Sequence, residues 1–411
     1  MTIREDAQRI IDDALRDAMP GAAVRGALAQ IDFNAAGRLL LVAVGKAAWA
    51  MAREASVLLG DQIDEGIVIT KYAHAKGDLP RLRIFEAGHP IPDENGFAAT
   101  AQATQMVKGL RPEDSVLFLL SGGGSALFEQ PLIPARELTD ITQQLLACGA
   151  DIVEMNTIRK RLSAVKGGRF AQMCAPAHVY AVVLSDIIGD PLDMIASGPA
   201  YPDLSTAEQA VSIQAKYNLR MSDEAQRLLR SEMPKALPNV TTNVAGSVKQ
   251  LCATAERTCR ELEYEPIVLT DCLTCEAREA GRFLAAIART HQNEARSVAY
   301  LAGGETVVRL TGRGKGGRNQ EIALAAAEGI AGCRDTCAFS FGSDGTDGPT
   351  DAAGGYADGE TAKRLERAGV DIWASLSDND AYHALKTCDG LIVTGPTGTN
   401  VNDLSVILIR R

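Results

Sequence analysis

The sequence lacks any run of about 18 uninterrupted apolar residues, the length that a helix needs to cross a bilayer. Its first residues, MTIREDAQRIIDDALRDAM, contain no apolar core of the kind found in a secretory leader, and their charges recur at helical spacing. We therefore expect an amphipathic helix here, no membrane partner and a cytoplasmic location.

Positive charge is also scarce. The chain has 42 Lys and Arg residues against 52 Asp and Glu residues, a formal net charge of −10. Nucleic acids and anionic membranes bind basic surfaces, so neither is an expected partner. A small anionic substrate is still compatible with this composition if the basic residues gather locally.

Cysteine clusters are missing as well. The nine cysteines are an odd number spread over 411 residues, which is typical of reduced thiols in a cytosolic protein. Cys272 and Cys275 form a C-x-x-C pair, but no group of cysteines and histidines completes a four-ligand zinc site around them. The five histidines share no motif. His89 lies in a loop where it could touch a substrate, although we expect structural roles for all five.

Two common catalytic signatures are absent. Gly45-Lys46 is followed by Ala47 instead of Ser or Thr, so there is no Walker A loop. Ser121 and Ser125 lack the G-x-S-x-G context of a hydrolase nucleophile. Any nucleotide must therefore bind through a different loop.

The chain does contain apolar runs that alternate with helical patterns. Most of the runs are continuous, as in strands buried on both faces of a parallel sheet. They cover 39–45, 66–70, 115–122, 179–185, 266–270, 297–304, 337–345, 391–395 and 405–410. This order predicts an α/β fold with mostly parallel sheets.

The length predicts more than one domain, because a single core stops growing at roughly 250–300 residues. The polar, proline-containing stretch 227–242 is the best candidate for a boundary. We expect a larger, Rossmann-like N-terminal α/β domain over 1–235 and a second α/β domain over 236–411. We expect the active site in the cleft between the domains.

A serine- and glycine-rich loop follows one of the buried runs and comprises Ser121, Gly122, Gly123, Gly124 and Ser125. Consecutive glycines let the backbone approach a ligand closely, and free N–H groups at a helix start attract anions. We predict that this loop binds nucleotide phosphates, with a tight strand–helix turn as the alternative.

Basic residues stand at two further positions of the N-terminal half. Lys46, at a strand–helix junction, could neutralise a phosphate or a substrate oxyanion, or it could be a solvated lysine. The segment 156–169 is basic in an otherwise acidic protein. From it we predict Arg159 as a substrate residue and Lys166 and Gly167 as nucleotide contacts; an ordinary basic helix face is the alternative.

Aspartates follow a later strand. Asp186 and Asp190 stand where a buried run ends, and carboxylates at such an edge suit Mg²⁺. We predict that both hold the metal, directly or through water. Turn formation is the alternative.

The C-terminal half has its own glycine-rich loop. Residues 312–317 match G-x-G-x-x-G, but the spacer positions carry Arg and Lys, and Arg318 follows at once. Arginine can clamp a phosphoryl or carboxylate group. We predict that Arg318 is catalytic. Glu305 and Asn319 are candidates for holding metal, water or a substrate hydroxyl, and we predict substrate contacts for both.

A second aspartate-rich stretch follows another strand. We predict that Asp344 or Asp351 orients or deprotonates a substrate hydroxyl. A magnesium-binding role for Asp344 and turn formation are the alternatives.

Several long segments resemble the glycerate 2-kinase family in the same order: VGKAA, LSGGGSALFE, NTIRKRLSAVKGGRFA, LSDIIGDPLDMIASGP, GGETVV, GRGKGGRNQE, GSDGTDGPTDAAG and TGPTGTNVNDL. The resemblance covers nearly the whole chain and implies an N-terminal glycerate kinase domain followed by a MOFRL domain. It also implies ATP and Mg²⁺ as cofactors, and transfer of the γ-phosphoryl group to the 2-hydroxyl of D-glycerate. The residues alone leave the 2- and the 3-phosphate open.

Two other functions stay open at this point. Some members of that family are called hydroxypyruvate reductases; an NAD(P)H-dependent enzyme would use 312–317 as its dinucleotide turn and Asp335 at the ribose. A non-catalytic regulator would bind a nucleotide or a sugar acid without turning it over. We expect small-molecule ligands in each case and allow for a homodimer.

Overall fold

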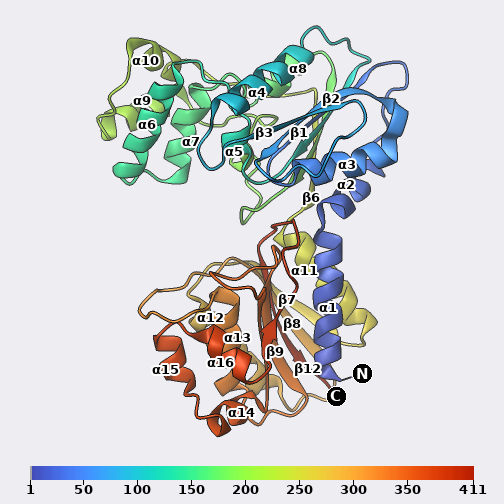
Figure 1. The fold of residues 1–411 in the computed structure, drawn as a ribbon, viewed down its shortest axis with the longest axis vertical. Helices are drawn as coiled ribbons and strands as arrows, with labels where there is room; N and C mark the ends of the chain where they lie inside the picture. The colour runs from blue at the N-terminus through green and yellow to red at the C-terminus, as the bar shows by residue number, and fades with distance from the viewer. Residues whose placement is uncertain (1) are drawn as a thin grey trace. The chain divides into compact units, whose positions relative to one another are not determined.

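The computed structural model describes residues 2–411, which divide into two compact units (Figure 1). The first unit comprises residues 23–185 and 190–245; the second comprises residues 2–22, 186–189 and 246–411. The border thus lies at 245 instead of the expected 235, and the first helix joins the second unit. No helix within residues 2–411 is both long enough and apolar enough to span a membrane.

The first unit is built on a sheet with the strand order β3-β2-β1-β4-β5-β6. Its strands are β1 (Leu39–Val44), β2 (Ile63–Lys71), β3 (Leu82–Ala87), β4 (Ser115–Leu120), β5 (His178–Leu184) and β6 (Val240–Gly246). All pairs from β3 to β5 are parallel, and β1 and β4 are buried throughout, which explains their unbroken apolar runs. This is the doubly wound order, in which ligands bind where the order reverses, between the carboxyl ends of β1 and β4.

Helices cover this sheet and extend beyond it. They are α2 (Pro20–Leu28), α3 (Ala48–Leu59), α4 (Glu94–Met106), α5 (Gly124–Leu127), α6 (Ala135–Ala147), α7 (Ile152–Arg161), α8 (Arg169–Cys174), α9 (Ala207–Lys216) and α10 (Asp223–Leu229), with 3₁₀ turns η1 (Gly60–Gln62) and η2 (Ile195–Ser197). Figure 1 shows α6, α7, α9 and α10 grouped at one end of the unit. This group has an apolar core of its own that includes Ile141, Ile158 and Leu229.

The second unit contains a mixed sheet with the order β11-β10-β9-β12-β8-β7. Its strands are β7 (Glu265–Leu273), β8 (Val298–Gly304), β9 (Thr336–Gly342), β10 (Gly354–Asp358), β11 (Leu391–Ile392) and β12 (Asp403–Ile409). Strands β7 and β8 are parallel, whereas β12 runs antiparallel to both β8 and β9. The α/β class and the two-domain organisation are confirmed, but this sheet is less parallel than we expected. The apolar runs reflect burial on both faces, which does not depend on strand direction.

The helices of the second unit are α1 (Ile3–Ala18), α11 (Val248–Glu261), α12 (Ala277–His291), α13 (Arg318–Gly329), α14 (Thr361–Arg367), α15 (Ile372–Ser377) and α16 (Ala381–Thr387). The apolar face of α1, with Ile10, Ile11 and Ala14, is buried in one core with α11 and the sheet. That packing explains why the N-terminal helix belongs to this unit. Helix α13 is buried on nearly all sides between α12 and the sheet.

Candidate active site

In the first unit, the ends of β1 and β4 carry two loops that form one structure. The backbone N–H of Lys46 donates to the Gly122 carbonyl at 2.9 Å, and that of Ala47 donates to Ser121 Oγ at 3.1 Å. Gly45 has φ +119°, and a Cβ there would lie 2.3 Å from Ser121 Oγ, so only glycine permits this approach. The predicted lysine and the predicted glycine loop thus come together at the point where the strand order reverses.

The glycine loop keeps its backbone donors available. Within residues 2–411, the N–H groups of residues 122–125 donate to no other group. Successive free N–H groups make a concave site for anions. This arrangement suits phosphate binding.

Two cationic or titratable side chains face this loop. A Cβ on Gly123 would lie 3.0 Å from the His89 ring and 3.2 Å from Lys46 Cγ. Lys46 is exposed, and its ammonium group has no ion pair within the described chain. Burial, together with the charges of Lys46 and Lys71, lowers the pKa of His89, so the imidazole is neutral at pH 7. The sequence favours a structural role for His89 and leaves a substrate contact open; its position beside the glycine loop supports the second interpretation.

Lys166 and Arg159 support the loop from inside the unit. The ammonium group of Lys166 is fully buried, pairs with Glu129 and donates to the Ser125 carbonyl at 2.7 Å. Burial lowers the pKa of Lys166 to about 8. Arg159 Nη2 donates to the same carbonyl at 3.4 Å. A direct contact of either residue with a ligand stays a prediction.

The segment after β5 closes the other side of the loop. Ser125 Oγ lies 3.1 Å from Ser197 Oγ, and the backbone N–H of Gly167 donates to the Ser197 carbonyl at 3.0 Å. The side chain of Asp190 has one buried oxygen, Oδ1, without a hydrogen-bond partner in residues 2–411. Asp186, the other predicted metal ligand, belongs to the second unit.

No group of three or more His, Cys, Asp or Glu side chains in the described chain is arranged to hold a metal by itself. A lone carboxylate nevertheless fits Mg²⁺, which usually takes one or two carboxylates together with phosphates and water. The unpartnered Asp190 oxygen is such a group.

In the second unit, backbone N–H groups of the loop at 312–317 donate hydrogen bonds to other residues of the same unit. The N–H groups of Arg313 and Lys315 donate to the carboxylates of Asp378 and Asp380, both at 3.0 Å. The N–H of Gly314 donates to the Asp378 carbonyl at 2.7 Å, and a Cβ on Gly314 would lie 2.4 Å from that of Asp380. The glycines therefore allow close packing against the turn between α15 and α16.

Arg318 is the first residue of α13, and two carboxylates hold its guanidinium group. Nε and Nη2 donate to the two oxygens of Asp403 at 2.5 and 3.0 Å, and Nη1 lies 3.2 Å from Glu305 Oε1. Asn402 Nδ2 donates at 3.1 Å both to Glu305 Oε2 and to the Asp186 carbonyl. The predicted residues Arg318, Glu305 and Asp186 are thus brought together.

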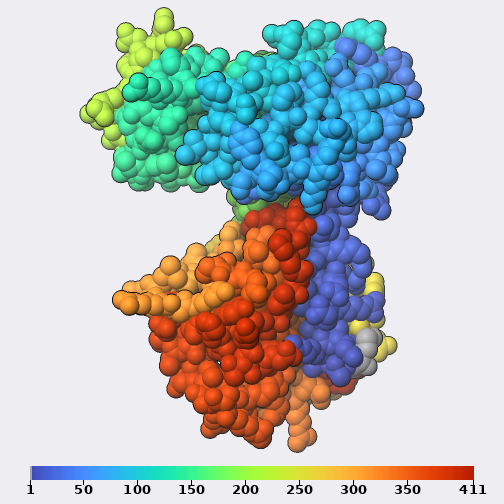
Figure 2. Space-filling view, viewed as in Figure 1, coloured from blue at the N-terminus to red at the C-terminus, as the bar shows by residue number. Residues whose placement is uncertain are grey.

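A cavity of about 1100 Å³ lies beside this cluster. Its lining includes the polar residues Arg318, Glu305 and Asp186 and the apolar residues Val307 and Leu310. Leu310 is 81% exposed, and Figure 2 shows the orange segment after β8 extending outward from the rest of the unit. The cavity can therefore take a ligand with both a charged and an apolar part.

The three remaining predicted residues of this unit, Asp344, Asp351 and Asn319, lie in different surroundings. A Cβ on Gly342 would lie 3.3 Å from Asp403 Oδ1 and 3.4 Å from Asp344 Oδ1, so Asp344 stands beside the partner of Arg318. Asp351 instead accepts a hydrogen bond from the Tyr382 hydroxyl at 2.8 Å and is exposed. Asn319 is fully buried, and its side chain bonds to Ser340 and Asp347.

Sequence reasoning missed two aspartates here. Asp347 accepts hydrogen bonds from the backbone N–H groups of Asn319 and Gln320 and so caps α13. Burial raises its pKa to about 7. Asp403 was also missed; the available signal was a charged residue at the start of a buried strand.

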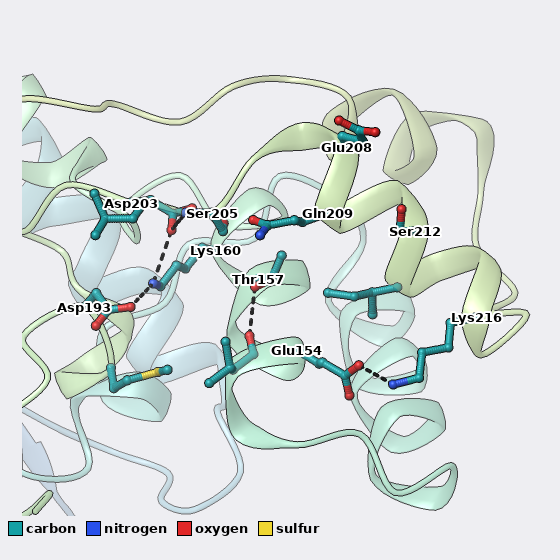
Figure 3. A pocket seen from close by; sticks show the side chains of 14 residues that line it. Glu154, Thr157, Lys160, Asp193, Asp203, Ser205, Glu208, Gln209, Ser212 and Lys216 are labelled. Carbon is teal, nitrogen blue, oxygen red and sulfur yellow. Dashed lines mark hydrogen bonds and ion pairs between the residues drawn. The ribbon is translucent and has the colours of Figure 1, made fainter.

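The first unit contains another cavity, of about 740 Å³, between α7 and α9 (Figure 3). Lys160 lines it, and its ammonium group lies 3.2 Å from Asp193 and 3.4 Å from Asp203. Glu154 and Lys216, which also line the cavity, pair at 2.6 Å. None of the residues predicted for the site lines this cavity.

Comparisons with known proteins place these features in a family. Residues 6–230 match the model described as a domain of unknown function, DUF4147, and residues 298–403 match the MOFRL family. The chain is 47% identical to "D-glycerate 2-kinase" of Thermotoga maritima over 99% of both chains. It is 39% identical to a "Putative hydroxypyruvate reductase" of Agrobacterium vitis, over 100% of this chain and 95% of that one.

A solved structure agrees with the sequence match. The crystal structure of glycerate kinase from Thermotoga maritima superposes with a TM-score of 0.94 at 47% identity, covering 98% of this chain and 99% of that chain. From these matches and the order of its two domains, the chain belongs to the glycerate 2-kinase family.

Proposed function

We propose that this protein is an ATP-dependent D-glycerate 2-kinase. It transfers the γ-phosphoryl group of ATP to the 2-hydroxyl of D-glycerate and releases 2-phosphoglycerate and ADP. The observation that carries this proposal is the 47% identity to a D-glycerate 2-kinase over 99% of both chains. Because the reaction consumes ATP, we expect the enzyme in the cytoplasm.

Phosphoryl transfer depends on positioning and charge neutralisation more than on covalent chemistry. The free N–H groups of residues 122–125 suit nucleotide phosphates, and the unpaired ammonium group of Lys46 suits the transferring group. In the second unit, Arg318 can neutralise a phosphoryl or carboxylate oxygen. Glu305 lies beside its guanidinium group and is 46% exposed, which leaves it accessible to substrate hydroxyls.

Asp344 is our preferred residue for orienting or deprotonating the 2-hydroxyl. It lies next to Asp403, which holds Arg318, and it accepts a hydrogen bond from the backbone N–H of Thr346 at 2.9 Å. Asp351 accepts its hydrogen bond from the Tyr382 hydroxyl. Asn319, Arg159, Lys166 and Gly167 then act by supporting the elements that carry the reacting groups.

Mg²⁺ would enter with the nucleotide, and the unpartnered oxygen of Asp190 fits one position on it. When bound, the metal neutralises phosphate charge. Asp186 is the second predicted ligand. This assignment rests on the donor type and on the buried, unpartnered oxygen.

The reductase alternative is weaker. The loop after β1 begins Gly45-Lys46-Ala47 and lacks the glycine fingerprint of a dinucleotide site. The G-x-G-x-x-G of the second unit has donors that are already bonded to Asp378 and Asp380. Its backbone has few free groups with which to bind a pyrophosphate.

One assay separates these activities. Purified protein with D-glycerate, ATP and Mg²⁺ should release ADP. The product should show one phosphorus signal split by a single proton, because C2 carries one hydrogen; a 3-phosphate would couple to two. Oxidation of NADH or NADPH with hydroxypyruvate, without ADP release, would establish the reductase instead.

A further inference from the structure

Arg318 is held in an orientation that one carboxylate largely determines. A guanidinium group has five N–H donors in a rigid plane. Asp403 accepts from Nε and Nη2 with both of its oxygens, and this paired geometry fixes the plane. Glu305 approaches from Nη1, but its side chain is 46% exposed and less constrained.

Asp403 is itself rigidly placed. It is the first residue of β12 and pairs with Gly304 of β8 on one side and Gly342 of β9 on the other. It is 4% exposed, and a Cβ on Gly342 would lie 3.3 Å from its Oδ1. Gly342 therefore leaves room for the carboxylate, and the pairing of β12 with strands on both sides fixes the backbone that carries it.

We propose that Asp403 is a positioning residue for Arg318 in the phosphoryl transfer. Its carboxylate fixes the guanidinium plane and leaves the N–H groups that neither Asp403 nor Glu305 engages to a ligand in the 1100 Å³ cavity. This inference rests on the proposed kinase function. The competing explanation is an ion pair that only joins α13 to β12.

The two explanations differ in what the loss of Asp403 costs. The Arg318 side chain is 32% exposed, so water can solvate the guanidinium group once its partner is gone. The fold should survive. A displacement of about 1 Å in a catalytic group, however, can lower a rate by about 100-fold.

The test is a double-mutant cycle on kcat/KM with Asp403→Asn, Arg318→Ala and the double variant. We expect Asp403→Asn to lower kcat/KM by about 100-fold, through the same parameter, kcat or KM, that Arg318→Ala changes. In the Arg318→Ala background, the same substitution should cost less than about threefold, because there is nothing left to position.

A loss below about threefold in the wild-type background overturns the inference, and so does an equal loss in both backgrounds. If Asp403→Asn does not fold, Asp403→Glu replaces it in the same cycle. It keeps the charge but moves the carboxylate by one methylene group, and the same thresholds apply.

Asp114→Asn is the matched control. Asp114 is also a buried carboxylate bonded to an arginine, Arg38, but it lies at the amino end of β4. It should lower the melting temperature and leave kcat/KM unchanged. Wild-type protein that releases no ADP with D-glycerate refutes the proposed function as well; an active wild type with an unaffected Asp403→Asn variant refutes this inference alone.

Discussion

The two glycine-rich loops of this protein follow buried strands and precede helices, yet their backbone donors have different fates. In the first unit, the N–H groups of residues 122–125 are bonded to nothing else in the described chain. In the second unit, Asp378 and Asp380 accept the donors of residues 313–315. A glycine pattern therefore indicates close backbone approach, and distant carboxylates decide whether the approach is to a ligand or to the protein.

The nearby cations differ in the same way. Lys46 is exposed and without an ion pair in residues 2–411, so it can move to meet an anion. Two carboxylates hold Arg318. One unit thus offers an adaptable charge and the other a fixed one, which matches the point-charge chemistry of lysine and the planar recognition of arginine.

The largest expected effect comes from Lys46→Ala. Removing the unpaired cation should lower kcat/KM with D-glycerate by about 1000-fold, because the donors of 122–125 alone cannot neutralise the transferring group. The melting temperature should stay the same, since the side chain is exposed.

Lys76→Ala, a change at another exposed lysine of the first unit, is the control and should keep wild-type kinetics. Near wild-type turnover in Lys46→Ala would remove Lys46 from the mechanism.

Alanine substitutions in the two loops test the comparison directly. Gly314→Ala should destabilise the second unit by about 2 kcal/mol, because its Cβ would lie 2.4 Å from that of Asp380. Gly123→Ala, with φ +86° and its Cβ 3.0 Å from the His89 ring, should instead lower kcat/KM by about tenfold and change stability less.

Thermal unfolding and steady-state kinetics of both variants show whether each substitution lowers stability or kcat/KM. If Gly314→Ala impairs catalysis at full stability, the loop at 312–317 binds substrate after all.

The smallest effect concerns the helix start that Asp347 caps. Its pKa is raised from 3.8 to about 7, so the folded protein binds this proton more tightly than the unfolded chain. The stability that this proton contributes is present at low pH and is lost as the pH rises from about 4 to about 7.

Asp347→Asn should therefore flatten the fall in melting temperature over this pH range. A wild-type melting temperature that does not change between about pH 4 and pH 7 would contradict the raised pKa of Asp347.

The sequence predicted the α/β class, the two domains and most of the loops that carry polar groups. Lys46 and residues 121–125 could be found because both follow strands whose unbroken apolar runs are unmistakable. The sequence could not predict that Asp378 and Asp380 accept hydrogen bonds from the backbone of the second loop, because some sixty residues of chain separate them from it. Asp403 was missed for the same reason: its partners are set by strand order and not by neighbouring residues.

The place of β12 has a consequence for how the chain is made. It comes after β8 and β9 in the chain, yet it lies between them in the sheet. During synthesis, the first unit can complete its sheet early, whereas β8 and β9 emerge with facing edges that have no strand to bond. Such open edges invite pairing with other chains, so the nascent second unit is the part that most needs protection until the last strand arrives.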